Sequence, residues 1–600
     1  MATQKRNFNG FDYRNYLKKQ GIYRIIKLKT IKKIDKLSII NPYFFNDCRR
    51  SSIVWIRERF PKPMNHYMTG LIFGYLDKSF DEMSEIYGSL GIIHLFALSG
   101  LQVGFFLNWF KFFLLRIGLT REKMILFQLP ISIVYAILTG LSLSVIRSLI
   151  QSYLSEKQFN KWDNFIATLI IILILFPYSI MTIGGSLTML YAFIITYIDS
   201  SDNGVREQLK RNILISIFSL PILLFNFSSF QPISIFLTYI FSFLFDYFIL
   251  PILVLSYIIS PFFNMVFLNS IFIWLEFLIK WIYHIFPKDI VFGHPSLWLA
   301  IIVFSFIVFC YDFKLNRGLQ SVLVLLILLI TLVIKNPLSN EVTIIDVGQG
   351  DSIFIKDMAG KTVLIDTGGK VDFTIKNGWK KRSETSNAEK TLVPYLKSRG
   401  VGKIDTLVLT HTDTDHVGDM LVLAKSIKIG QILVSQGSLT NQSFVKKLKM
   451  IKSPVKIAHQ GDRLPIMGSY LEILYPLVVG DGSNNDSIVL HGNLLDINFL
   501  FTGDLESEGE KVLVEHYSKL KVDVLKAGHH GSKGSSSQIF LKHIQPKIII
   551  ISAGENNRYH HPHQEMLERV FSIGGKVFRT DRQGAIRFIG IKHFIIETVR

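Results

Sequence analysis

The stretch LTHTDTDHVGD, residues 409–419, decides the fold of the C-terminal half of this chain. The apolar residues before it predict a buried strand, so its polar residues lie at the strand's carboxyl end, where α/β sheets usually carry their sites. In such a tight loop, His411 and Asp413 can face one metal ion, and Asp415 and His416 a neighbouring one. The aspartates shift the expected metal from zinc toward manganese without excluding zinc. Taken alone, the cluster could also be a polar turn with a helix N-cap.

Three further apolar runs end in metal-ligand residue types. VLIDTGG places Asp366 after a predicted strand, FLFTGD places Asp504 after another, and VLKAGHHGS places His529 and His530 after a third. Helical patterns such as EKTLVPYLKSRG lie between the strands, which is typical of a layered α/β domain. Strands that each end in a ligand type predict one converging site for metal-assisted hydrolysis of an acyl, thioester or phosphodiester bond.

The preceding half of the chain is apolar. The 600 residues are 49% hydrophobic, with 48 Phe, and the apolar runs gather between about residues 90 and 335. This content excludes a single soluble domain. Runs close to the ~20 apolar residues that a bilayer requires predict eight or nine spans. Their approximate limits are 90–115, 124–149, 164–177, 179–198, 212–227, 232–257, 262–286, 295–311 and 319–335.

Polar side chains inside these spans indicate a channel or transporter rather than an anchor. His94, Ser99, Gln102 and Arg147 fall in or near membrane segments, where each is costly unless it faces a partner or water. They are therefore candidate channel residues, although Arg147 could also be a helix-end residue that reaches the membrane surface. The connecting loops are all mildly basic, so the orientation in the membrane stays open.

Charge divides the chain further. Residues 1–63 are strongly basic and 64–338 form the predicted membrane domain, while 339–600 form the α/β domain. The basic segment is either a flank lying on anionic lipid or a contact surface for a polyanion. The net charge of +20 suits a polyphosphate partner.

One insertion in the α/β domain is typical of single-strand binding. The segment 370–390 places Lys380, Lys381 and Arg382 beside Trp379. A cationic loop with an aromatic ring suits single-stranded nucleic acid, whose bases stack on such rings. These four residues are the predicted DNA-binding group.

The H-x-D-x-D-H stretch, the LIDTGG before it, and the TGD and HHGS after it together resemble the metallo-β-lactamase fold, an αββα sandwich. The resemblance implies two divalent ions, manganese or zinc. The implied ligands are His411, Asp413, Asp415, His416, Asp504, His529 and His530.

The resemblance also implies a role for each ligand. His411 and Asp413 would serve the first metal, Asp415 and His416 the second, and Asp504 would bridge them. Asp415, His416 and Asp504 would carry the catalysis.

The resemblance also implies roles for His529 or His530 and for Asp366. One of His529 and His530, with His529 slightly preferred, would complete the second metal site. Asp366 would support the loop behind the metals.

The fold usually supplies one more histidine before the bridging aspartate. The candidates His459 and His491 sit in no obvious family motif, and Asn484 or Asn485 of SNNDSIVL could replace it. The first metal site is therefore expected to be the weaker one.

Further stretches resemble the ComEC family of competence proteins, membrane channels that take up single-stranded DNA in bacterial transformation. They are GIIHLFALSGLQVG (91–104), TGLSLSVIRSLI (139–150), DVGQGDSIFI (346–355), HHGSKGSSS (529–537) and NNRYHHP (556–562). Aspartate at position 413 is then a family trait. The chain starts at FDYRNYLKKQGI, which resembles the last piece of an oligonucleotide-binding barrel, so we expect the DNA-receiving module to be largely missing. Gln102 stands where the family often has histidine.

The resemblance implies a multi-pass protein of the bacterial plasma membrane that conducts single-stranded DNA, while a metal-dependent nuclease domain degrades the other strand. The sequence AGKT (359–362) lacks the leading glycine of a P-loop, so energy must come from a partner or a gradient. The expected partners are incoming DNA, membrane lipid, and the DNA receptor and cytoplasmic ATPase of a competence apparatus, with a possible homo-oligomer. Two alternatives stay open: a channel whose metal domain binds DNA without cutting it, and a membrane-bound metallohydrolase of a small ester or lipid-linked substrate.

Overall fold

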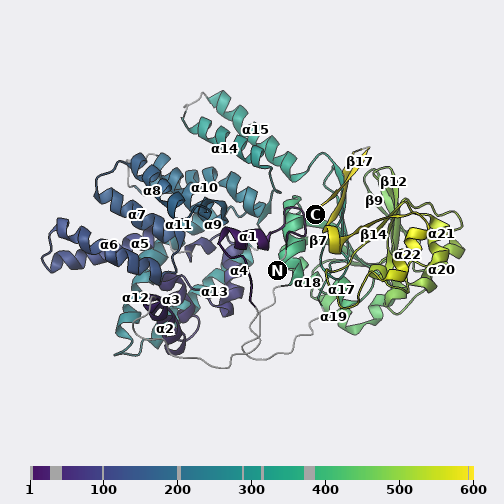
Figure 1. The fold of residues 1–600 in the computed structure, drawn as a ribbon, viewed down its shortest axis with the longest axis horizontal. Helices are drawn as coiled ribbons and strands as arrows, with labels where there is room; N and C mark the ends of the chain where they lie inside the picture. The colour runs from purple at the N-terminus through teal and green to yellow at the C-terminus, as the bar shows by residue number, and fades with distance from the viewer. Residues whose placement is uncertain are drawn as a thin grey trace. The chain divides into compact units, whose positions relative to one another are not determined.

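The computed structural model describes residues 4–26, 43–96, 100–198, 204–286, 289–312, 317–370, 386–591 and 593–600. The chain divides into two compact units, whose elements are labelled in Figure 1. Unit 1 consists mainly of Asn15–Ile290 and Leu297–Asn316, and unit 2 of Ala2–Arg14, Val291–Ser296 and Arg317–Arg600. Each unit has a hydrophobic core of its own.

Unit 1 is built from helices. Its main helices are α2 (Phe44–Arg59), α3 (Met64–Phe73), α4 (Asp81–Ser89), α5 (Gly100–Arg116), α6 (Arg121–Leu138), α7 (Leu143–Glu156), α8 (Lys161–Leu175), α9 (Ile183–Tyr197), α10 (Val205–Phe227), α11 (Ser234–Leu244), α12 (Leu250–Ile259), α13 (Asn269–Ile285) and α14 (Leu297–Asp312). Helix α1 (Tyr13–Lys19) begins in unit 2 and ends in unit 1, and a π-helical turn, η4 (Phe245–Ile249), joins α11 to α12.

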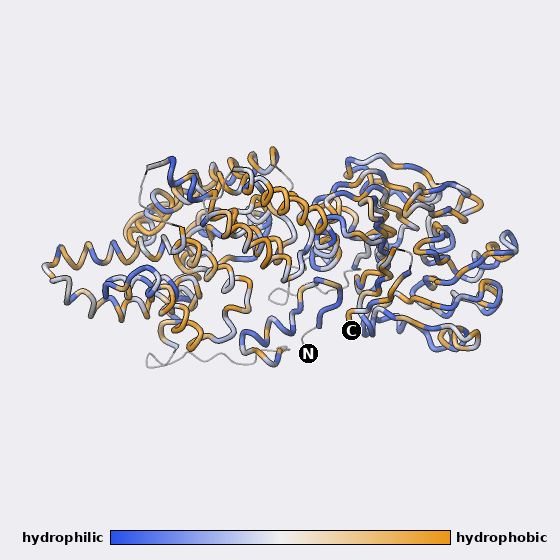
Figure 2. The backbone as a smooth tube through the Cα atoms, turned by 90° about the horizontal axis from the view of Figure 1, so that it is seen from above, coloured by the Kyte–Doolittle hydropathy of each residue, from blue (hydrophilic) through white to orange (hydrophobic). Residues whose placement is uncertain are grey.

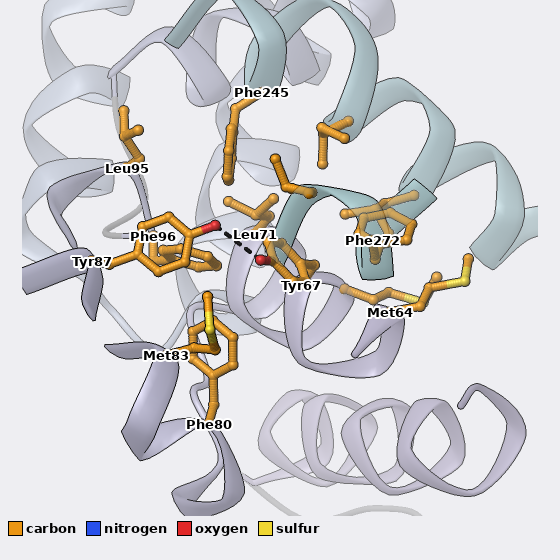
Figure 3. Packing of buried hydrophobic residues seen from close by; sticks show 14 of the residues in the cluster. Met64, Tyr67, Leu71, Phe80, Met83, Tyr87, Leu95, Phe96, Phe245 and Phe272 are labelled. Carbon is orange, nitrogen blue, oxygen red and sulfur yellow. Dashed lines mark hydrogen bonds between the residues drawn. The ribbon is translucent and has the colours of Figure 1, made fainter. Parts of the chain in front are cut away.

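The core of unit 1 gathers aromatic rings from several helices. Tyr67 of α3 and Tyr87 of α4 are both fully buried, and their hydroxyl oxygens lie 2.9 Å apart. Figure 3 shows this pair surrounded by the rings of Phe80, Phe96 and Phe272. Each buried hydroxyl thus has a hydrogen-bond partner, which offsets the cost of burying it in an otherwise apolar cluster.

Several helices of unit 1 and one of unit 2 consist largely of apolar residues, as the hydropathy colouring of Figure 2 shows, and many of these side chains are exposed. In the described part of the chain, four stretches of helix are long and apolar enough to cross a membrane: Arg206–Phe227, Ser234–Ile259, Val266–Ile285 and Gly318–Lys335. They coincide with four of the predicted spans. Three other predicted spans correspond to the shorter apolar helices Phe127–Leu138, Ile183–Tyr197 and Leu297–Asp312.

One predicted span is two helices instead of one continuous helix. The segment 124–149 is two helices, because α6 ends at Leu138 and α7 begins at Leu143. Gly140 and Leu141 between them both have positive φ, which an α-helix does not accommodate. The Thr139 hydroxyl donates to the carbonyl oxygen of Tyr135, which helps to end α6. The turn lies in TGLSLS (139–144), and the apolar runs on both sides of it led to the prediction of one span.

Unit 2 contains helix α15 (Arg317–Lys335) and an αββα domain. One sheet has the strand order β17-β16-β3-β4-β5-β6-β7-β8 and the other β15-β14-β13-β12-β11-β10-β9. The strands are β3 (Asn340–Ile344), β4 (Ile353–Lys356), β5 (Thr362–Ile365), β6 (Lys403–Leu409), β7 (Lys428–Val434), β8 (Val455–Ile457), β9 (Arg463–Ile466), β10 (Ser469–Tyr475), β11 (Val489–Leu494), β12 (Ile497–Phe501), β13 (Val524–Lys526), β14 (Ile548–Ile551), β15 (Lys576–Arg579), β16 (Ile586–Gly590) and β17 (Phe594–Thr598).

Alternating side chains explain why the two sheets pack face to face. In β4, Ile353 and Ile355 enter the core between the sheets, whereas Phe354 faces the helices on the other side. In β12, Phe499 enters the same central core, whereas Leu500 faces the opposite helical layer. Because successive strand residues point to opposite faces, continuous apolar runs satisfy both layers at once.

Helices cover the outer face of each sheet. The helices are α16 (Val393–Ser398), α17 (Thr414–Val417), α18 (Met420–Ser426) and α19 (Gln442–Lys449) on the first sheet, and α20 (Ser507–His516), α21 (Gln538–Ile544) and α22 (Gln564–Ser572) on the second. The predicted αββα domain after a helical membrane half is confirmed. Strands β5 to β8 run parallel to one another, as do β12 to β15, so their carboxyl ends lie at one edge of each sheet.

Candidate metal centre

The loop after β6 presents the four residues of the H-x-D-x-D-H stretch. His411 and His416 are completely buried, whereas the side chains of Asp413 and Asp415 are 54% and 23% exposed. Helix α17 begins at Thr414, and the backbone N–H of His416 donates to the carbonyl oxygen of Asp413. This helical turn directs the side chains of Asp415 and His416 to their separate positions.

Side chains from three strand ends converge on a small volume. The Nε2 atom of His416 lies 3.1 Å from Oδ2 of Asp504 and 3.3 Å from Nε2 of His530. The same nitrogen of His530 lies 3.2 Å from Oδ2 of Asp415 and 3.4 Å from Oδ2 of Asp504. His411 Nε2 is farther away, at 4.0 Å from Oδ2 of Asp504. Imidazole nitrogens and carboxylate oxygens therefore face one another, as in a divalent-metal site.

A buried carboxylate fixes the orientation of His416. Oδ2 of Asp366 lies 2.8 Å from Nδ1 of His416, and it also accepts a hydrogen bond from the hydroxyl of Thr410. The backbone N–H of Thr410 donates to the other oxygen of Asp366. With Nδ1 of His416 facing Asp366, its Nε2 is the nitrogen that faces the other ligands, which is the arrangement of a metal ligand backed by a carboxylate.

The structure brings His530 into the centre rather than the slightly preferred His529. His530 Nδ1 lies 3.1 Å from the carbonyl oxygen of Ser552, so its Nε2 is left to face the other ligands. His529 Nδ1 instead lies 2.8 Å from Oε1 of Glu506 and 3.4 Å from Nδ2 of Asn484. Both histidines have positive φ, so the loop turns sharply between them and separates their rings.

The carboxylates alter the pKa values of the two central histidines. Burial lowers the pKa of His530, but Asp504 and Asp351 outweigh it and raise it to about 9. Burial likewise opposes the charge on His416, yet Asp504 and Asp366 hold its pKa well above the ordinary value. Protons and metal ions therefore compete for the same nitrogens.

Three buried polar atoms around the centre have no hydrogen-bond partner among the described residues. His411 Nε2, Asp504 Oδ1 and Asn484 Oδ1 are buried and make no hydrogen bond to any residue that the structure describes. Burial and the neighbouring His416 lower the pKa of His411 to about 3, so its imidazole is neutral and can act as a ligand. Unpaired buried polar atoms are costly, and nitrogen and oxygen atoms of these types are ones that a divalent ion can bind.

The two histidines considered for the first metal lie elsewhere. His459 is largely exposed, with its Nδ1 3.6 Å from Oδ2 of Asp462. His491 lies on β11, where its Nε2 faces the carbonyl oxygen of Lys521 at 3.0 Å. Asn485 is also engaged, because its Oδ1 accepts from the backbone N–H of Glu506. Asn484 is thus the remaining member of the predicted replacements.

Sequence reasoning did not assign Asp351 to the centre. Its carboxylate belongs to a buried group with His416, Asp504 and His530 in which the potential ligand atoms lie within 4.8 Å of one another. Asp351 stands at the end of the DVGQGD motif, in the loop between β3 and β4. The sequence shows Asp351 as an acidic residue next to a predicted strand. It was missed because it precedes β4, whereas the predicted ligands follow the carboxyl ends of strands.

The predicted channel residues lie on separate elements of unit 1. His94 is in the short 3₁₀ helix η2 (Ile93–Leu95), Gln102 is buried in α5, and Arg147 of α7 donates to Oε1 of Gln151. Ser99 lies outside the described residues. So do the predicted DNA-binding residues Trp379, Lys380, Lys381 and Arg382.

Comparisons with known proteins match both halves of the chain. A model of the competence protein family matches residues 71–317, and a model of the metallo-beta-lactamase superfamily matches residues 345–555. The chain is 32% identical to ComE operon protein 3 of Bacillus subtilis over 96% of its length and 78% of the relative. It is 33% identical to the competence protein ComA of Neisseria gonorrhoeae, and 29% identical to recombination protein 2 of Haemophilus influenzae. Each of these two matches covers 41% of this chain, and 32% and 28% of the respective relatives.

Proposed function

This chain belongs to the ComEC family of competence proteins, and from that premise we propose that it takes part in DNA uptake across the plasma membrane of a bacterium. The helical unit would conduct one DNA strand, and the metal domain would hydrolyse phosphodiester bonds of the other. The candidate membrane spans support the first role, and the convergent ligands of the metal domain support the second. A DNA receptor and a cytoplasmic ATPase are the proposed partners.

The observation that carries the nuclease proposal is the convergence of His411, Asp415, His416, Asp504 and His530 at strand ends in a metallo-β-lactamase fold. When bound, two divalent ions would activate water for attack on a phosphodiester and stabilise the developing charge. The oxygen-rich set favours manganese and accommodates zinc.

The chain's own residues divide into two ligand groups. Asp415, His416 and His530 would hold one ion, because their ligand atoms already face one another. His411 would hold the other ion together with Asp413, whose Oδ2 lies 3.8 Å from His411 Nε2.

Two further residues complete this assignment. Asp504 would bridge, since one of its oxygens faces His416 while the other has no hydrogen-bond partner among the described residues. Asn484 would offer its buried side-chain oxygen in place of the histidine that this fold usually supplies.

One rival function has an observation in its favour. His459 and His491 both lie away from the centre, so the first metal has one imidazole fewer than the fold usually supplies. A weakly held first ion would give a domain that binds DNA without cutting it. Metal stoichiometry and cleavage must therefore be measured on the same preparation.

The test uses the full-length chain in detergent, loaded with Mn²⁺ or Zn²⁺, with single-stranded and duplex DNA as substrates. We expect cleavage that requires metal and falls at least 100-fold in Asp504→Asn. Asp462→Asn is the matched control, because this aspartate is exposed and contacts His459 at the surface.

Each other outcome contradicts part of the proposal. Two bound ions with no DNA cleavage would favour the rival function, a channel whose metal domain binds DNA without cutting it. Hydrolysis of a small phosphate or carboxylic ester without DNA binding would favour the membrane-bound metallohydrolase. Equal cleavage by wild type and Asp504→Asn would show that the activity comes from a contaminant.

A further inference from the structure

A lysine and an aspartate lie buried behind the metal centre, and neither is among the ligands assigned above. Lys526 is the last residue of β13, and its Nζ lies 2.5 Å from Oδ2 of Asp351. Lys526 Nζ also donates to the carbonyl oxygen of Ala527 at 3.0 Å. Both charged side chains are at most 1% exposed. Because β13 belongs to one sheet and Asp351 precedes β4 in the other, the ion pair joins the two sheets beside the site.

The second oxygen of Asp351 faces the back of a ligand histidine. Oδ1 of Asp351 lies 3.4 Å from Nδ1 of His530, which also faces the carbonyl oxygen of Ser552 at 3.1 Å, and the other nitrogen of His530 faces Asp415 and Asp504. The imidazole therefore lies between the Lys526–Asp351 pair on one side and the ligand carboxylates on the other. A ligand histidine normally has such an anion or carbonyl behind it, which fixes the ring and strengthens its donation to the metal.

Position and charge distinguish Asp351 from a direct ligand. Its Oδ2 is occupied by the ammonium group of Lys526, and a divalent ion at that oxygen would meet the repulsion of a buried positive charge. Lys526 has no water to solvate it at 0% exposure, so it depends on Asp351 as its partner. Lys526 and Asp351 thus neutralise each other, and only Oδ1 of Asp351 is left to face His530.

We propose that Lys526 and Asp351 form a positioning pair that holds the imidazole of His530 in the orientation required for metal binding. This inference rests on the proposed metal site. It gives one shared role to Asp351, the last residue of DVGQGD, and to Lys526, which lies just before HHGS. Lys526 anchors Asp351, and the charge of Asp351 acts together with the carbonyl oxygen of Ser552 to orient His530.

The test measures the affinity of the full-length protein in detergent for Mn²⁺, by calorimetry and by the electron paramagnetic resonance signal of free Mn²⁺. The variants are Asp351→Asn, Lys526→Met and the double variant. We expect each single variant to bind Mn²⁺ at the His530 site 10- to 100-fold more weakly, the usual effect of losing such an outer partner. The double variant should lose no more than the weaker-binding single variant, because the two residues act as one unit.

A second buried ion pair of the same domain provides the control. Glu341 of β3 is 1% exposed and accepts a hydrogen bond from Nε of Arg399 at 2.7 Å. Glu341→Gln should lower the thermal stability of the domain while leaving Mn²⁺ affinity within about twofold of wild type. The Glu341→Gln variant thus shows how the loss of a buried ion pair by itself affects stability and Mn²⁺ affinity.

The outcomes separate this inference from the proposed function. Wild-type affinity in folded Asp351→Asn would overturn the positioning role, as would an equal loss of affinity in Glu341→Gln. Asp351→Asn is nearly isosteric, so it decides the question even if Lys526→Met fails to fold. Failure of the wild-type protein to bind Mn²⁺ or Zn²⁺ would overturn the proposed metal site itself. Neither result depends on DNA cleavage.

Discussion

His530 and His416 show how single residues tune the centre for metal ions. Each ring uses Nδ1 for an oxygen behind it, the carbonyl of Ser552 for His530 and the carboxylate of Asp366 for His416. Each then turns Nε2 toward Asp504. The carboxylates that attract a cation attract a proton equally well, so metal binding must be linked to pH.

We predict that Mn²⁺ binding weakens as the pH falls from 9 to 6. Asp504 and Asp351 raise the pKa of His530 to about 9 although burial opposes the charge, so the metal-free protein holds a proton on this imidazole at neutral pH. A bound ion must displace that proton, and affinity should fall by up to about tenfold per pH unit below pH 9 for each proton displaced. Calorimetry in buffers of different ionisation enthalpy would count the protons released. A flat pH profile with no proton release would contradict this linkage.

At the scale of elements, the first residues of the chain act as a docking segment on the metal domain. Asn7 is 2% exposed, and its side chain pairs with the backbone of Asp346 through one hydrogen bond in each direction, both 2.9 Å long. Arg6 Nε donates to Oδ2 of Asp346, and the N–H of Ala585 donates to the carbonyl oxygen of Arg6. The guanidinium of Arg587 lies 4.1 Å from the ring centroid of Phe8. These contacts hold the first residue of the DVGQGD loop, which ends at Asp351.

We predict that Asn7→Ala loosens this loop. The variant leaves the N–H and C=O of buried Asp346 without their partner, at a cost of about 1–3 kcal/mol. Hydrogen exchange of the full-length protein should therefore become about tenfold or more faster at the amide of Asp346. Gln4→Ala is the control, because Gln4 is exposed in the same segment. Unchanged exchange in Asn7→Ala would mean that the segment does not dock in solution.

At the scale of the whole molecule, three separate passages of the chain return to the metal domain. Besides the docked N-terminal segment, the backbone N–H of His294 donates to the carbonyl oxygen of Ser398 at 2.8 Å. The end of α15 is held as well, since Nζ of Lys356 donates to the carbonyl oxygen of Lys335 at 2.8 Å. All three passages are hydrogen-bonded to the metal domain within unit 2, so we expect these contact points to lie on the same side of a membrane as that domain.

This arrangement restricts how the membrane segments cross. The chain between Arg14 and Val291 must cross an even number of times, so the seven predicted spans in that region cannot all be complete crossings. Helices α14 and α15 must together also cross an even number of times. With 16 and 19 residues they are roughly 24 and 28 Å long, close to the hydrocarbon thickness of a bilayer, so we expect each of them to cross the membrane once.

We predict the sidedness of four single-cysteine variants made in a Cys48→Ser, Cys310→Ser background. Cysteines at Gln4, Ser296 and Asp462 should react with a membrane-impermeant maleimide from one side of sealed vesicles. A cysteine at Gly318, at the start of α15, should react only from the other side. Labelling of positions 4 and 462 from opposite sides would show that the N-terminal segment is not docked on the metal domain when the protein is in a membrane. Labelling of position 318 from the domain's side would show that α15 does not cross the membrane.

The amino-acid sequence by itself determined the membrane half, the αββα domain and the chemical character of the site. Hydrophobic run length depends only on composition, and strand-end motifs place ligand types such as His411 and Asp504 where parallel strands end. The tertiary structure decided the rest. It placed His530 rather than His529 beside Asp415 and Asp504, because the loop turns at these two positive-φ residues, and it placed Asp351 of the loop before β4 beside His530. It also showed that 124–149 is two helices and that Asn7 docks more than 300 residues away in sequence. These outcomes depend on loop torsions and on contacts between distant segments, which local periodicity does not encode.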